Sequence, residues 1–84
     1  MKSFNITVDE KYFNMLWRSL SERESELESN IEQSGPDSDE AALMGNDLVY
    51  VRMCKKDLEE NARQANFADS VFSLDDGYID LADL

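Results

Sequence analysis

The sequence predicts an all-α fold in which two long helices form an antiparallel hairpin. Apolar residues recur at helical spacing in two separate segments, so each segment should present one apolar face. Between them lies Ser34-Gly35-Pro36, where glycine favours a helix end and proline cannot continue a helix. Because this break is short, the two helices are expected to be neighbours that run in opposite directions. The apolar residues are Phe13, Trp17, Leu20, Leu27 and Ile31 before the break, and Met44, Leu48, Val51, Leu58, Ala62 and Ala65 after it.

The chain is expected to begin with a short extended arm over residues 1–7, because apolar and polar side chains alternate there. The first helix is expected to follow over residues 8–33. Thr7 and Glu10 have the spacing of a capping box, in which the threonine hydroxyl accepts a first-turn amide and the glutamate reaches back. This predicts Thr7 as the residue at which the first helix starts.

A turn over residues 34–37 is expected to lead into a second helix over residues 38–66. Each apolar seam is interrupted once by a charged residue, Glu24 in the first helix and Lys55 in the second. In the hairpin register these two residues lie about one turn apart. Two arrangements are open: both side chains reach out to the edge of the seam, or they form an ion pair that fixes the register.

The two apolar faces are expected to bury a single seam between the helices. Aligning the helices from the turn places the bulky Phe13 opposite the small Ala62, which gives the complementary volumes that close packing requires. The side chains expected to be buried between the helices are Trp17, Leu20, Leu27, Leu48, Val51 and Leu58.

The composition changes after the second helix. The tail, residues 67–84, carries five aspartates and no basic residue, yet it is also rich in apolar side chains. We expect a short helix near residues 68–74, then a turn, then an extended segment over residues 78–81. Such a segment is suited to docking on a groove or a sheet edge. The candidate partner-binding residues are Phe67, Phe72, Tyr78, Ile79 and Leu81.

Size and composition restrict the function. Eighty-four residues with a formal charge of -11 make one acidic domain with a small core. The acidic balance disfavours direct contact with nucleic acid or anionic membranes, and neither an apolar run of membrane length nor a signal-peptide pattern occurs. The single cysteine, Cys54, suits a reducing compartment, so a cytoplasmic location is expected.

The residues for common catalytic chemistry are missing. The chain has no histidine, which removes the usual general base, the Cys-His and Ser-His dyads and most zinc sites. Its acidic residues are spread around the helices, and only Asp57 and Glu60 form an i, i+3 carboxylate pair, so a magnesium cluster is not expected. We therefore expect no catalytic residue, no cofactor and no metal, and a protein that is not an enzyme.

The apolar stripes are wider than two helices can share, which indicates that something else covers them. The tail, the arm or a second copy of the chain would do so, and a homodimer with a four-helix arrangement is the expected outcome. Val49 and Met53 lie one turn apart on the far side of the second helix. They are interpreted either as scattered exposed residues or as part of a second contact surface.

Two non-enzymatic functions follow from these features. The first is a protein–protein interaction or regulatory module that self-associates through its helix stripes and its tail, and that also docks a protein partner whose identity the sequence does not give. The alternative is an acidic mimic of DNA, of the phage or mobile-element type, that inhibits a nucleic-acid-binding enzyme by occupying its basic groove. The candidate mimic surface near the hairpin tip is Glu24, Glu26, Glu28 and Glu32.

Overall fold

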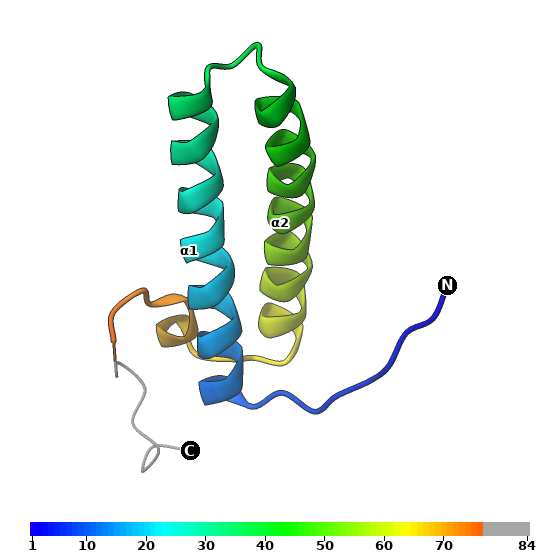
Figure 1. Ribbon diagram of the computed structural model, residues 1–84. Coiled ribbons are helices and arrows are strands. Elements are labelled where there is room, and N and C mark those ends of the chain that lie inside the picture. The colour runs from blue at the N-terminus through cyan, green and yellow to red at the C-terminus, as the bar shows by residue number, and fades with distance from the viewer. Residues whose placement is uncertain (77–84) are drawn as a thin grey trace.

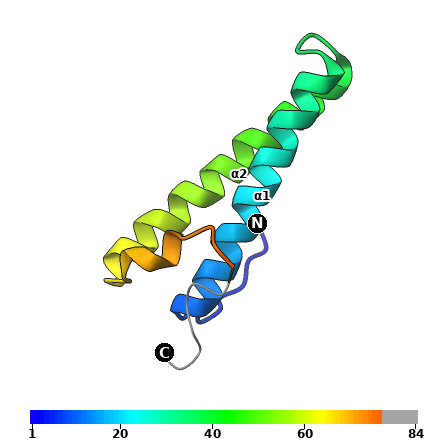
Figure 2. The ribbon, with the colours of Figure 1, turned by 90° about the vertical axis from the view of Figure 1, so that its left-hand side faces the viewer.

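A computed structural model, which describes residues 1–76, has the predicted all-α hairpin. Helix α1 (Glu10–Ser34) and helix α2 (Asp39–Gln64) lie side by side, and a short 3-10 helix, η1 (Asp69–Phe72), folds back at the open end of the hairpin (Figure 1). Turning the molecule shows η1 crossing from the end of α2 to the first turns of α1 (Figure 2). Within the described residues there is no strand, and the expected extended segment at 78–81 lies outside them.

The prediction that Thr7 caps α1 is wrong, and the helix starts two residues later than expected. Asp9 is the N-cap, and its carboxylate accepts a hydrogen bond from the Tyr12 amide at 2.8 Å. Val8, just before the cap, packs against the core cluster that contains Phe13, the fourth helical residue. This apolar contact across the cap is a hydrophobic staple, and it requires Val8 to lie outside the helix.

The connection between the helices follows the predicted chemistry. Gly35 ends α1 with a φ of 89°, a left-handed conformation that side chains with a Cβ rarely adopt. Ser38 is the N-cap of α2: its hydroxyl accepts from the Ala41 amide at 3.0 Å and donates to the Gly35 carbonyl at 3.0 Å. Helix α2 therefore begins at Asp39, one residue after the expected start.

Helix α2 ends at Gln64 and not at the expected Asn66, because a Schellman motif closes it. Asn66 adopts a φ of 61° and donates to the Arg63 carbonyl, while the Phe67 amide donates to the Ala62 carbonyl at 3.0 Å. Asparagine tolerates this left-handed conformation better than most residues. The motif turns the chain back, so Phe67 and the segment after it return to the core.

The core consists of two apolar clusters along the hairpin. The cluster near the turn contains Leu27, Leu48 and Val51, and the cluster at the open end contains Phe13, Ala62 and Val71. Three residues expected to be buried, Trp17, Leu20 and Leu58, are only partly buried and pack around these clusters. Two helices fully cover only the central row of their interface, so the residues beside that row keep some solvent contact.

The returning chain is fixed by aromatic rings and by one buried amide. Phe67 and Phe72 pack edge-on against Phe13, with ring centroids 5.8 and 5.6 Å away. The fully buried Asn14 amide donates to the carbonyls of Val71, at 3.0 Å, and Ser73, at 2.9 Å. Part of the tail therefore covers the open end of the hairpin. The tail was one of the three covers that the sequence left possible, together with the arm and a second copy. The short helix expected in the tail is η1.

Replacing Leu27 by alanine should lower the free energy of unfolding by about 2 to 5 kcal/mol, because the side chain is 1% exposed and leaves a cavity. Urea denaturation followed by circular dichroism measures this value. Leu74→Ala is the matched control: Leu74 is 64% exposed, so its loss should change stability by less than about 0.5 kcal/mol. Equal effects of the two substitutions on the free energy of unfolding would contradict the burial of Leu27 between α1 and α2.

Replacing Asn14 by alanine should release η1 while the two long helices remain. The substitution removes one buried and one partly buried hydrogen bond and should cost about 1 to 3 kcal/mol. Trp17 is the only tryptophan, and its ring lies 4.9 Å from that of Phe72, so its emission should shift to the red when η1 detaches. Asn61→Ala, which removes a bond within α2, is the control and should leave the emission unchanged. An unshifted emission in Asn14→Ala would contradict the proposed anchoring.

Candidate interaction surface

Helix α2 carries a second apolar face, on the side that points away from α1. Leu48 and Val51 pack in the seam, and at 100° per residue the exposed apolar residues of α2 lie on the opposite side of the helix. Tyr50 is 68% exposed and Met53 57% exposed. We call this surface the α2 outer face; it consists of Ala42, Leu43, Asn46, Val49, Tyr50 and Met53, all of which are exposed.

The α2 outer face is uncharged, although the chain has a formal charge of -11. Charged residues come only at its ends and edges: Asp39 and Asp57 follow the same helical row beyond each end, and Lys56 lies beside one edge. A single exposed apolar residue needs no explanation, but a contiguous apolar stripe with a charged rim is typical of a protein contact surface. Val49 and Met53 thus belong to the same face as Leu43 and Tyr50.

Gly45 borders this face in the second turn of α2. A Cβ added at Gly45 would meet no atom within 4 Å, so packing within the chain does not require glycine there. Glycine in a helix interior costs about 0.5 to 1 kcal/mol relative to alanine. Because glycine has no Cβ, the backbone of α2 has less side-chain cover at this edge of the face, beside Asn46 and Val49.

The N-terminal arm does not cover the apolar stripes. It leaves the start of α1, passes the end of α2 and extends away from the hairpin (Figure 1). Phe4 is 83% exposed and Ile6 53% exposed. The arm does form one wall of an open cleft of about 580 Å³, which Ile6 shares with Cys54, a free and half-buried thiol, and with Leu58.

The candidate partner-binding residues of the tail fall into two groups. Phe67 and Phe72 are half-buried and pack on Phe13, so much of their surface is used inside the molecule. Tyr78, Ile79 and Leu81 lie outside the described residues.

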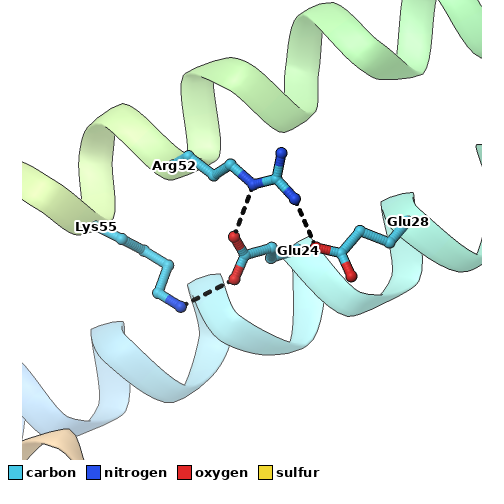
Figure 3. Close-up of polar contacts among 4 residues, drawn as sticks. All are labelled: Glu24, Glu28, Arg52 and Lys55. Atoms are coloured by element: carbon cyan, nitrogen blue, oxygen red, sulfur yellow. Dashed lines mark hydrogen bonds and ion pairs between the residues drawn. The ribbon is translucent and has the colours of Figure 1, made fainter.

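Glu24 and Lys55 form the ion pair that the sequence left as one of two alternatives. The Glu24 carboxylate accepts from Lys55 Nζ at 2.9 Å and from Arg52 Nε at 3.0 Å, while Arg52 also donates to Glu28 at 2.7 Å (Figure 3). The hydrogen bond from Lys55, followed by that from Arg52, lowers the pKa of Glu24 below its ordinary value of 4.5. The two carboxylates in turn raise the pKa of Arg52. Sequence reasoning missed Arg52, which lies on the edge of α2 next to the seam.

Most of the candidate mimic surface is therefore matched by basic groups. Glu24 and Glu28 contact Arg52 across the hairpin, and Glu26 pairs with Arg23 in α1 at 2.6 Å. Glu32 is exposed near the turn. Lys55 also lies 4.6 Å from the centre of the Trp17 ring, a cation–π contact that ties the pair to the apolar core.

Within residues 1–76 no group of three or more acidic or cysteine side chains is placed to hold a metal ion. None of the described helices is long and apolar enough to cross a membrane. The chain matches no protein-family model, no curated protein and no solved structure. Within residues 1–76 the most distinctive surface feature is the exposed and uncharged α2 outer face.

Replacing Glu24 by glutamine should lower stability at pH 7 and reduce the loss of stability in acid. Because its folded pKa is lowered, Glu24 contributes stability above about pH 4.5, and that contribution disappears as the pH falls through the lowered pKa. Urea denaturation between pH 3 and pH 7 measures the difference from wild type, which should narrow in acid. Glu26→Gln, an exposed pair within one helix, is the control. A constant difference across the range would contradict a stabilising role for the Glu24 pair.

Proposed function

We propose that the protein is a small, non-enzymatic protein–protein interaction module that self-associates. The observation that carries this proposal is the α2 outer face, on which Leu43 and Tyr50 are each more than two-thirds exposed. The described part of the tail, residues 67–76, packs at the open end of the hairpin and does not cover this face. A chain that exposes large apolar side chains on one side of a helix gains free energy when another protein covers them.

The alternative, an acidic mimic of DNA, has weaker support. A mimic needs many separated carboxylates that can meet the basic groups of a target enzyme. Glu24 and Glu28 are matched by Arg52 and Lys55, and breaking these pairs to bind a target would cost the free energy that they contribute to the hairpin. The acidic surface is better explained as one that keeps the module soluble.

A foreign protein partner remains part of the proposal, together with a cytoplasmic location, which suits the free Cys54. Because Phe67 and Phe72 pack on the core, we assign contact with such a partner to Tyr78, Ile79 and Leu81. We propose neither a direct role in nucleic-acid binding nor any cofactor.

Self-association should strengthen with salt. Two copies that each carry a formal charge of -11 repel each other, and raising the ionic strength from about 0.01 to 0.15 M shortens the screening length from about 30 to 8 Å. Apolar contacts change little over this range. Sedimentation velocity at micromolar concentrations should therefore show a dimer of the 9.6 kDa chain whose fraction rises with salt.

A monomer at every concentration and salt would contradict the proposed self-association. A dimer that dissociates as salt is added would indicate an interface held by ion pairs, and would equally exclude the apolar face as its basis.

A further inference from the structure

We infer that the side chain of Tyr78 docks in a pocket of its own chain, between α1 and η1. Tyr78 itself lies outside the described residues. Three features of residues 1–76 support the contact: two unpartnered polar groups in the pocket, its aromatic wall, and the position of Asp76 at its edge. The contact goes beyond the proposed function, and it does not depend on self-association.

The pocket contains two buried polar groups that no described residue satisfies. It is open and has a volume of about 480 Å³. One of the two groups is the hydroxyl of Ser21, a residue only 8% exposed, and the other is Nε of Arg18, whose side chain is 14% exposed. Residues 18 and 21 are neighbours on one side of α1 because they lie three positions apart. A buried polar group without a partner is destabilising, so both groups favour a ligand with a hydrogen-bond acceptor.

Aromatic rings form the apolar wall of the pocket. Trp17 and Phe72 both line it, and their ring centroids lie 4.9 Å apart with an angle of 77° between the planes. The two rings thus present both a face and an edge, and aromatic pairs prefer edge-to-face or offset packing. A third aromatic ring therefore suits this wall.

The charges at the pocket favour a neutral acceptor over a carboxylate. Two acidic residues, Glu22 and Glu24, line the pocket. Its two basic residues are already paired, Lys55 with Glu24 at 2.9 Å and Arg18 with Asp76. A carboxylate would add a negative charge to this balanced set, whereas a phenol is neutral at pH 7 and its oxygen accepts hydrogen bonds. A tyrosine combines this oxygen with the aromatic ring that the wall favours.

The chain itself brings a tyrosine to the pocket. Asp76, the last described residue, pairs with Arg18, which lines the pocket. Two further residues of extended chain span about 7 Å, so Tyr78 stays within reach of the pocket. A group tethered at this range has an effective concentration on the order of millimolar, which favours it over a separate chain at micromolar concentration. The other two tyrosines, Tyr12 and Tyr50, are fixed in α1 and α2.

Docking of Tyr78 determines which tail residues a foreign partner can reach. Side chains alternate along an extended segment, the conformation expected for residues 78–81. With Tyr78 in the pocket, Ile79 and Leu81 point to the opposite side and stay available to the partner. The partner reaches Tyr78 only by displacing it from the pocket.

Nuclear Overhauser effects test the contact directly. In dilute wild-type protein, the ring protons of Tyr78 should show contacts with the indole of Trp17 and the ring of Phe72. In an equimolar mixture of isotope-labelled and unlabelled chains, filtered spectra should show these contacts within one chain only. Absence of the contacts would overturn the inference. Contacts between chains would also overturn it, because the tyrosine of a second copy would then fill the pocket. Neither result would contradict self-association through the α2 outer face.

Removing the Tyr78 hydroxyl tests the hydrogen bonds. Tyr78→Phe keeps the ring and should raise the equilibrium constant for unfolding by about three- to tenfold, measured by urea denaturation. In a Ser21→Ala background the same substitution should have a smaller effect, because one of the two donors is already gone. Tyr12→Phe is the matched control: Tyr12 is 46% exposed, so its change should stay within about twofold. Equal effects of Tyr78→Phe in the two backgrounds, or equal effects of Tyr78→Phe and Tyr12→Phe, would overturn the proposed docking.

Discussion

Phe13 lies where α1, α2 and η1 meet, and its ring is only 2% exposed. Two helices alone would leave one side of this ring in water, so the chain that follows α2 has to return and cover it. The Schellman motif at Asn66 turns the chain, and the buried Asn14 amide holds the carbonyls of Val71 and Ser73. Packing at this end determines the distribution of apolar surface over residues 1–76: this part of the chain closes the open end of the hairpin and leaves the far side of α2 exposed.

The polar contacts across the hairpin complete this arrangement. Lys55 reaches both the Glu24 carboxylate and the Trp17 ring, and Arg52 joins Glu24 to Glu28. These contacts connect the same faces of α1 and α2 along the middle of the hairpin, so they help to set the register of one helix on the other. They also use carboxylates that a DNA mimic would need. Acidic residues are spread over most of the surface, and the α2 outer face is the clearest uncharged region within residues 1–76.

The sequence was sufficient to predict the hairpin, its turn at Gly35, the pairing of Phe13 with Ala62 and a short helix after α2, because helical periodicity and turn residues act locally. It left open whether the tail, the arm or a second copy covers the apolar stripes. It did not identify Asp9 as the cap, since Thr7 and Asp9 both fit the local pattern and only the packing of Val8 on the core decides between them. Asn14 was missed because a lone asparagine within a helix gives no signal until a distant segment returns to it. Of the α2 outer face, sequence analysis singled out only the pair Val49 and Met53, because the extent of the face depends on which side of α2 packs against the core.

The central claim is that the chain closes its open end internally and leaves the α2 outer face for a second copy. Amide chemical shifts recorded by nuclear magnetic resonance during dilution test it most directly, because they locate the surface that separates when a dimer dissociates. The account predicts shifts concentrated at residues 42–53 of α2, with those at residues 67–76 nearly constant. Shifts concentrated at residues 67–76, or no dependence on concentration, would contradict it.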